Sequence, residues 1–267
     1  MIGLLSSRAA AFGLAAGVTR VVYGELRRRS PGGASRWERP NYAGRTVHLA
    51  AGPAVAAGAA VGALPARTRG AAALAVLAAG ACGAYDDVAG AGDPRRGFRA
   101  HLSALRDGEV TSGAVKLFGI SAAGLAAGAL LKERPVDRLL AGVVIAGTAH
   151  LVNLVDVRPG RAAAAVLALG APGLLRKGPA GMLSAASMGA ATAVLPDDVA
   201  ERTMVGDTGA HALGAALGAA IVAGNGRAGL AAHAAGLVAA AVYGDTVSAL
   251  AQQAGETIRR CVSGGLQ

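Results

Sequence analysis

Long apolar runs without charged residues recur along the chain, and they constrain its fold more than any other feature. The clearest of them, residues 71–82, consists almost entirely of Ala, Val, Leu and Gly. About 20 apolar residues suffice to cross the hydrocarbon core of a bilayer as a helix. Since 53% of the residues are hydrophobic and only 16% are charged, the composition also favours a membrane protein over a soluble one. The sequence therefore predicts an all-α, polytopic transmembrane bundle.

About nine spanning helices are expected if each apolar run is one membrane crossing. Their predicted ranges are 3–22, 47–66, 70–88, 112–131, 138–156, 162–175, 178–195, 208–225 and 228–250. The range 162–175 is the shortest. We assign residues 1–267 to a single integral membrane domain.

Charged residues divide between the two sets of alternating connections. Most of the 26 Lys and Arg residues belong to one set, which the positive-inside rule places in the cytoplasm, with the N-terminus outside and the C-terminus inside. Of the 16 Asp and Glu residues, all except Glu133 and Asp137 belong to the same side. Membrane insertion makes no demand on acids, so their gathering indicates a cytoplasmic site that handles cations or protons. Topology accounts for the net charge of +10, and no nucleic-acid partner is expected.

Three short acidic motifs border the apolar runs at predicted cytoplasmic ends. They are Gly83-Ala84-Tyr85-Asp86-Asp87, Asn153-Leu154-Val155-Asp156 and Gly206-Asp207-Thr208-Gly209. Acids are costly next to hydrocarbon and so indicate function, although solvation of an ordinary helix end is the alternative for any single Asp. If the three ends meet, their carboxylates could hold Mg²⁺, which prefers oxygen ligands and is often shared with substrate phosphates.

This ordered set of motifs resembles the polyprenyl-phosphate N-acetylhexosamine-1-phosphate transferases, which include the enzymes that start peptidoglycan lipid I. These polytopic enzymes of the cytoplasmic membrane move a sugar-1-phosphate from a UDP-sugar to a polyprenyl phosphate in cell-envelope glycan synthesis. The likeness covers about residues 40–260 and includes Asn41-Tyr42-Ala43-Gly44-Arg45, which is similar to the family's first cytoplasmic loop. A homodimer is a possible assembly.

The resemblance implies roles for individual residues. Asp207 and Asp156 would bind Mg²⁺, with Mn²⁺ as a possible substitute, and Asp86 or Asp87 would deprotonate or orient the lipid phosphate. Asn153 would support the metal site or the nucleotide. Asn41, in the first loop, would contact substrate.

Other polar residues are candidate substrate ligands from their own chemistry. Arg158 and Arg161 could grip a diphosphate through their guanidinium groups, or could simply be positive-inside flanks. Lys116 lies one turn inside a predicted helix, where it must snorkel or pair with an acid, and could bind the lipid phosphate. His211 shares a helix face with Asp207 and could touch metal or phosphate, or pack. His150 and His233 are isolated in apolar runs and are expected to pack, whereas Asp245, an acid inside the last run, could join the acidic cluster.

Two departures from the family leave other functions open. Pro159 stands where family members usually carry a second Asp, and the long His-containing loop near their C-terminus is absent. A family member without turnover, serving as a lipid-phosphate-binding or assembly partner, is therefore the alternative. A small transporter would require inverted repeats and broken helices, and no convincing pair of repeats occurs. The sequence specifies neither the sugar nor the glycan pathway.

Overall fold

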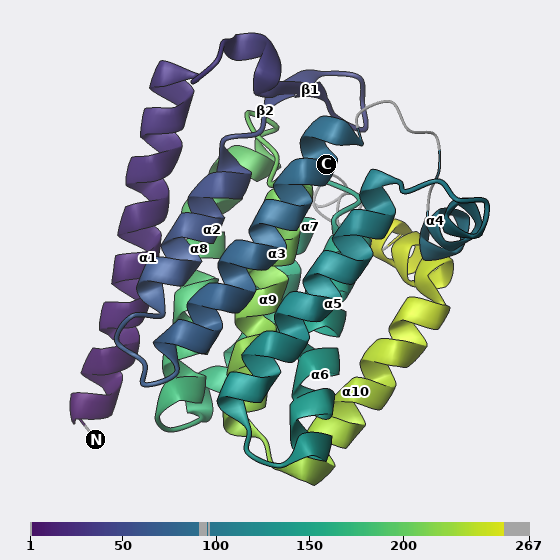
Figure 1. Ribbon diagram of the computed structural model, residues 1–267. Helices are drawn as coiled ribbons and strands as arrows, with labels where there is room; N and C mark the ends of the chain where they lie inside the picture. Colours follow the sequence, from purple (N-terminus) through teal and green to yellow (C-terminus); the bar gives the residue numbers. More distant parts are fainter. Residues whose placement is uncertain (1, 91–94, 96, 254–267) are drawn as a thin grey trace, which may run out of the picture.

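The computed structural model describes residues 2–90, 95 and 97–253, and this part of the chain is almost entirely helical (Figure 1). The helices are α1 (Ile2–Arg29), α2 (Ala51–Gly62), α3 (Arg69–Ala89), α4 (Gly97–Arg106), α5 (Ser112–Leu131), α6 (Pro135–Val155), α7 (Arg161–Gly170), α8 (Pro179–Val199), α9 (Gly206–Gly224) and α10 (Arg227–Val242), followed by the helix Gly244–Gln253. The all-α prediction is confirmed.

Short elements occupy two predicted connections. The 3-10 helix η1 (Ala34–Arg36) and an antiparallel hairpin of β1 (Glu38–Pro40) and β2 (Thr46–His48) follow α1. A second 3-10 helix, η2 (Ala171–Leu175), continues α7, while α4 lies within the connection between α3 and α5. These elements were not predicted, because apolar periodicity detects long helices better than short pieces.

The prediction of nine spanning helices is wrong. Within the described ranges, α3, α5 and α6 are long and apolar enough to cross a membrane, and α10 with Gly244–Gln253 makes a fourth if this pair, bent by 84°, is one span. With 12 and 10 residues, α2 and α7 are shorter than a crossing requires. Charged residues lower the hydropathy of α1, and small or polar residues lower that of α8 and α9. Several long apolar helices nevertheless make the chain a possible membrane protein.

The central helix of the bundle is α9, which is buried along almost its whole length. It packs against α2, α3, α6 and α8. Gly214 and Gly218 face the backbone of α6 at Ala149 and Ile145, where an added Cβ would overlap. Small residues permit such close approach between helices, so the Gly- and Ala-rich composition of α9 suits its central position.

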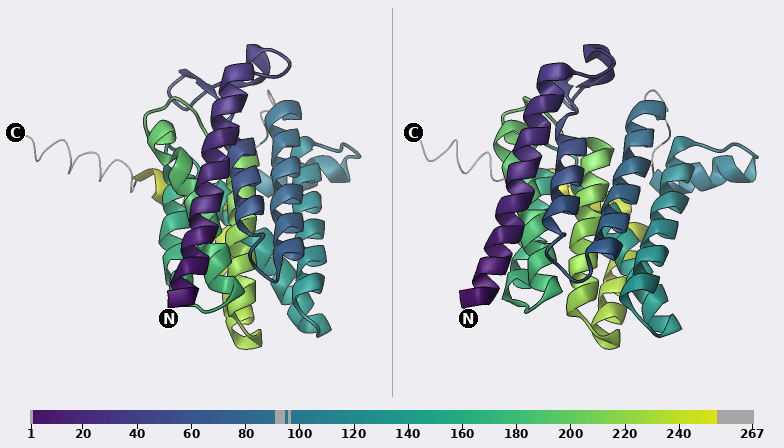
Figure 2. Two further views of the ribbon diagram at one scale, coloured as in Figure 1. Left: turned by 90° about the vertical axis from the view of Figure 1, so that its left-hand side faces the viewer. Right: turned by 60° about the vertical axis from the view of Figure 1, so that its left-hand side comes forward.

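The helices run side by side, so that alternate connections gather at the same end (Figures 1 and 2). We call the upper end in Figure 1, with the hairpin and the C-terminal ends of α3, α6 and α8, the acidic end. The turns after α2, α5 and α9 lie at the other end, which we call the basic end. Glu133 and Asp137 belong to the turn between α5 and α6 and thus to the basic end, as their sequence positions predicted.

Candidate functional site

Asp87 joins the end of α3 to the start of α9. Its carboxylate accepts hydrogen bonds from the backbone N–H groups of Asp207 and Thr208 at 3.0 and 2.9 Å, and from the hydroxyl of Thr208. The first N–H groups of a helix have no partners within the helix, and a carboxylate satisfies them well. Asp87 is therefore the cap of α9, supplied by a residue 120 positions earlier in the chain.

Two glycines permit this junction. Gly83 lies one turn before Asp87 on α3, and a Cβ there would overlap the backbone of Asp207 and Thr208. Gly206 begins α9 with φ of 58°, a left-handed conformation that suits glycine. The contact between the two acidic motifs thus explains why each of them contains a glycine at these positions.

Asp86 and Asp207 face the same ammonium group. The Nζ atom of Lys116, on α5, donates to the carboxylate of Asp86 at 2.6 Å and also to the carboxylate of Asp207. Their side chains are largely buried, with 17–27% exposed. Two carboxylates thus share one ammonium group, so a divalent cation could replace it between them.

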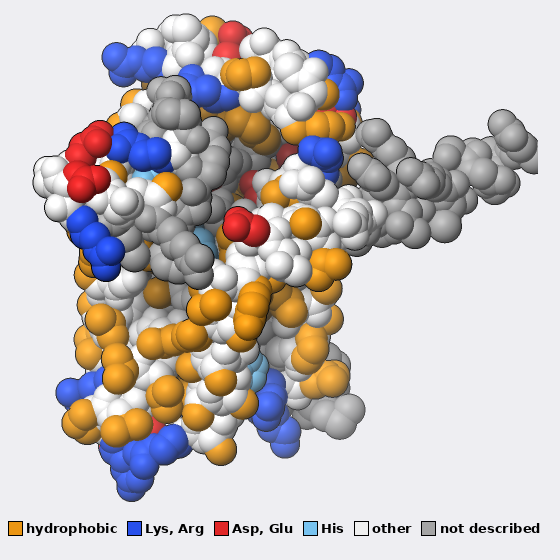
Figure 3. Space-filling model, turned by 90° about the vertical axis from the view of Figure 1, so that its right-hand side faces the viewer, with side chains coloured by type: hydrophobic (Ala, Val, Ile, Leu, Met, Phe, Trp, Pro, Cys, Tyr) orange, Lys and Arg blue, Asp and Glu red, His pale blue; other side chains and the backbone are white. Residues whose placement is uncertain are grey.

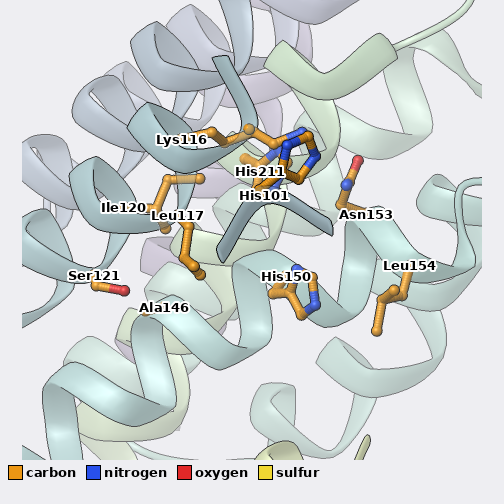
Figure 4. Close-up of a pocket in the computed structure, with 11 residues that line it drawn as sticks. His101, Lys116, Leu117, Ile120, Ser121, Ala146, His150, Asn153, Leu154 and His211 are labelled. Carbon is orange, nitrogen blue, oxygen red and sulfur yellow. The ribbon is translucent and has the colours of Figure 1, made fainter. Parts of the chain in front are cut away.

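A pocket of about 160 Å³ adjoins the cluster (Figure 4). Lys116, Asn153, His101, His150 and His211 supply its polar lining. Apolar side chains complete it, from Leu117, Ile120 and Leu154. In Figure 4, Lys116, His101 and His211 lie together, while Asn153 and His150 project from α6. The lining thus combines groups that bind phosphate oxygens with a surface for hydrocarbon.

Hydrogen bonding fixes the orientation of His211. Its Nδ1 atom lies 2.7 Å from the backbone carbonyl oxygen of Asp207. Since a carbonyl only accepts, Nδ1 carries the proton and Nε2 retains a lone pair. His211 is 1% exposed, so burial and this hydrogen bond together hold its ring next to Asp207.

Asp156 lines a second pocket, of about 100 Å³, together with Asn41, Tyr42, Arg158 and Asp198. Burial and the charges of Asp198 and Asp207 raise the pKa of Asp156 well above its ordinary value. The guanidinium group of Arg158 stacks on the ring of Tyr42 at 4.4 Å from its centroid. This pocket therefore contains a cationic group and an aromatic face beside the acids.

Asn41 is occupied within its own loop. Its Oδ1 atom accepts hydrogen bonds from the backbone N–H groups of Ala43 and Arg45, and its Nδ2 atom donates to Glu201 at 2.6 Å. Arg45 forms an ion pair with the same Glu201, whose φ is 55°. These contacts give Asn41 a structural role in joining the first loop to the segment before α9.

The predicted site residues other than Asp87, which caps α9, fall into three groups. Asp86, Asp207, Lys116, His211 and Asn153 come together at the cluster and the first pocket. Asp156, Asn41 and Arg158 meet in the second pocket. Arg161 begins α7 and lines neither pocket, and Asp245 is exposed beyond the bend after α10.

Sequence reasoning missed several residues of the two pockets. His150 was expected only to pack, yet it lines the first pocket with Asn153. The three-residue spacing between them, which places both on one helix face, was the available signal. No sequence signal indicated Asp198 and Glu201 of the second pocket. Their hydrogen-bond partners, Gly160 and Asn41, are distant in sequence.

The donor groups fit a divalent cation that completes its coordination with substrate oxygens. Among the described residues, no three His, Cys, Asp or Glu side chains are grouped closely enough to hold a metal ion by themselves. Asp86 and Asp207 instead present two carboxylates to one cation position, now taken by Lys116. Mg²⁺ is commonly held by one or two carboxylates, several waters and substrate phosphates.

The fold and the site define a helical bundle with a cation position and a phosphate-compatible pocket at its acidic end. No protein-family model matches the chain, and neither does any curated protein. The resemblance to the sugar-phosphate transferases therefore depends on the motifs.

Proposed function

We propose that this protein is a phosphoglycosyl transferase that moves a sugar-1-phosphate from a UDP-sugar to a polyprenyl phosphate. N-acetylhexosamine-1-phosphate is the favoured group. The observation that carries the proposal is the meeting of Asp86 and Asp207, from α3 and α9, at one cation position beside the first pocket. The two acids come from distant parts of the sequence and lie next to a pocket with cationic and apolar lining. This arrangement suits an amphiphilic phosphate substrate.

The reaction joins an oxygen of the lipid phosphate to the β-phosphorus of the UDP-sugar and breaks the bond to UMP, which leaves. Mg²⁺, held by Asp86 and Asp207, would neutralise charge on the diphosphate. Lys116 and Asn153 would bind phosphate oxygens from the pocket wall, and Leu117, Ile120 and Leu154 would contact the prenyl chain. Asp86 would orient the attacking phosphate through its partner Lys116, since Asp87 is engaged in capping α9.

The second pocket would serve the nucleotide side of the donor. Arg158, stacked on Tyr42, supplies the guanidinium group that suits a diphosphate. Asp156, in the same pocket, would face the nucleotide and not the cation, because among the described residues it is not grouped with Asp86 and Asp207. Pro159 lines the same pocket, where the resembling family carries a carboxylate.

Release of UMP tests the proposal. Purified protein with UDP-GlcNAc, undecaprenyl phosphate and Mg²⁺ should release UMP, and Asp207→Asn should lower the rate at least about 100-fold, because an electrostatic contact to the reacting groups is lost. Asp137→Asn is the matched control, since Asp137 pairs with Arg227 at the basic end. Absence of UMP with several UDP-sugars, or full turnover by Asp207→Asn, would refute the proposal.

A lipid-phosphate-binding protein without turnover is the second candidate. The ammonium of Lys116 already occupies the position between Asp86 and Asp207, which favours this alternative, and Pro159 agrees with it. Retained binding of undecaprenyl phosphate, with no UMP release at any Mg²⁺ concentration, would support it. A transporter would require a symmetric pair of broken helices, and the described residues contain a single bent pair.

The acidic end would face the cytoplasm of a cell whose cytoplasmic membrane holds the bundle. This orientation is proposed from the positive-inside rule. Single cysteines at Ser35 and Glu133, introduced after Cys82 and Cys261 are replaced, should react with an impermeant thiol reagent from the cytoplasmic and the outer side respectively. The reverse pattern would contradict the orientation.

A further inference from the structure

A larger cavity, of about 340 Å³, extends from Arg176 and Asn225 at the basic end of the bundle to Leu151 on α6. Leu151, Leu169, Leu217, Ile221 and Leu237 supply its main walls. They come from α6, α7, α9 and α10. Because α7 has only 10 residues and continues as the 3-10 helix η2, the wall on this side is short. We call this cavity the apolar groove.

Three polar side chains that line the apolar groove are hydrogen-bonded to nearby backbone. Thr148 donates to the carbonyl of Val144, and Asn225 to that of Ile221. The Nδ1 atom of His233 donates to the carbonyl of Gly229. The groove thus presents hydrocarbon to its occupant, and its volume lies in the range of about 300–1,000 Å³ that is typical of ligand sites.

Arg176 lies at the mouth of the apolar groove. It is exposed and makes no ion pair with any carboxylate in the described part of the chain. The guanidinium group of Arg8 donates to the backbone carbonyl of Arg176, which adds positive charge beside it. Asp137, a carboxylate of the same end, is already paired with Arg227. Figure 3 shows basic side chains gathered at this end, below a broad hydrophobic belt.

We propose that the apolar groove binds an anionic phospholipid of the leaflet at the basic end. One acyl chain would fill the groove while the phosphate contacts Arg176. Charge complementarity favours this occupant, because an exposed guanidinium group beside an apolar groove matches a phosphate group joined to acyl chains. The polyprenyl phosphate acceptor is disfavoured, because both pockets of the candidate site lie at the acidic end. The proposal depends on a membrane location and is independent of the transferase activity.

Lipid binding to the detergent-purified full chain, measured by native mass spectrometry, tests this inference. Phosphatidylglycerol should bind in preference to phosphatidylcholine of the same chains. Arg176→Gln should weaken phosphatidylglycerol binding about fivefold, the effect of one cationic contact near a lipid surface. Ala168→Phe, at an exposed groove position, should block the groove and weaken binding of the same lipid as strongly.

Lys177→Gln is the matched control, because Lys177 is the adjacent exposed cation and does not line the groove. Its effect should stay below about twofold. Equal binding of the two lipids, equal effects of Arg176→Gln and Lys177→Gln, or displacement of phosphatidylglycerol by undecaprenyl phosphate at lower concentration would each overturn the proposal. Arg176 and Lys177 are both exposed, so these two variants keep the test valid even if Ala168→Phe fails to fold. UMP release by Arg176→Gln, assayed in parallel, separates the outcome from that of the transferase proposal.

Discussion

Lys116 occupies the position that a metal ion would take between Asp86 and Asp207. Without any cation there, two largely buried carboxylates would face each other, and like charges at that separation repel strongly. The ammonium group therefore stabilises the empty site. If a divalent ion binds, Lys116 can turn toward substrate phosphate without leaving the acids unneutralised.

Replacing Lys116 should therefore make stability dependent on a divalent cation. We expect Lys116→Gln to unfold at lower temperature in EDTA, with a loss on the order of 2 kcal/mol, somewhat below the range for fully buried pairs. Millimolar Mg²⁺ should restore much of the loss. Lys132→Gln, which removes an ammonium group that donates to the carbonyl of Asn225 at the basic end, should show no Mg²⁺ dependence. Equal melting of Lys116→Gln with and without Mg²⁺ would show that Asp86 and Asp207 do not share a metal.

Asp87 has a different role from its neighbour, although the doublet looks uniform in the sequence. Asp87→Ala should reduce stability by about 1–2 kcal/mol, as loss of a helix N-cap does, and Asp87→Asn should lose less, because its amide oxygen can still accept from one set of donors although its NH₂ group cannot accept from the other. Thermal unfolding measures the first effect, and UMP release should show that Asp87→Asn keeps most of its turnover. An inactive Asp87→Asn with unchanged stability would instead place Asp87 in the chemistry.

The contact between α3 and α9 depends on the absence of a side chain at Gly83. Gly83→Ala should destabilise the protein by about 1–3 kcal/mol, the usual effect of overpacking, because its methyl group would collide with the backbone of Asp207 and Thr208. Gly17→Ala in α1 is the matched control, since nothing lies within 4 Å of its Cβ position. There the substitution should be neutral or stabilise by up to about 1 kcal/mol through helix propensity. Similar unfolding temperatures for both variants would contradict the close contact.

The sequence predicted the positions of most helices but not how many could cross a membrane. Apolar runs located α3, α5 and α6 within a few residues, because hydropathy alone determines such segments. The Ala- and Gly-rich run at α2 was extended too far, and the run 162–175 was taken as one span although α7 changes to η2 at residue 171. Ala and Gly are neither polar enough to end a span nor apolar enough to require one. Tertiary contacts decide where such helices stop.

For the site, the sequence indicated which acids belong to it, but not which role or which pocket each acid has. The convergence of Asp86 and Asp207 followed from their motifs and from the alternation of the helices. The capping role of Asp87 and the location of Asp156 in a separate pocket depend on partners far away in sequence. His150 was misjudged because a lone His in an apolar run gives no sign of whether its helix face meets a pocket.

Across the whole molecule, acids gathered at one end make folding stability depend on pH. Asp198, in the last turn of α8, is 2% exposed and accepts a hydrogen bond from the backbone N–H of Gly160 at 2.9 Å. Burial raises its pKa to about 6. For the adjacent Asp197, burial also opposes ionisation, but hydrogen bonds from Arg20 and Arg202 outweigh it and lower the pKa. The two neighbours thus respond to pH in opposite senses.

The raised pKa of Asp198 means that the folded protein holds this proton more tightly than the unfolded chain. Its contribution to stability is full below about pH 4, the ordinary carboxyl range, and is lost as the pH rises through about 6. Asp198→Asn removes that loss, and its amide oxygen can still accept the hydrogen bond from the N–H group of Gly160. The variant should therefore be more stable than the parent at pH 7.5, by an amount on the order of 2 kcal/mol, and equally stable at pH 4. Chemical unfolding at both pH values measures this. A variant that is less stable at pH 7.5 would show that Asp198 is ionised and paired in the native state.

The three charged groups of the cluster lie on helices that appear at different times during synthesis. Asp86 is made first, Lys116 next and Asp207 last. A nascent chain that has reached α5 already contains Asp86 together with the ammonium group of Lys116, so this carboxylate has a partner before the other half of the bundle is made. When α9 is made, Asp87 caps its first turn. Asp207 then pairs with the ammonium group of Lys116, which is already in place.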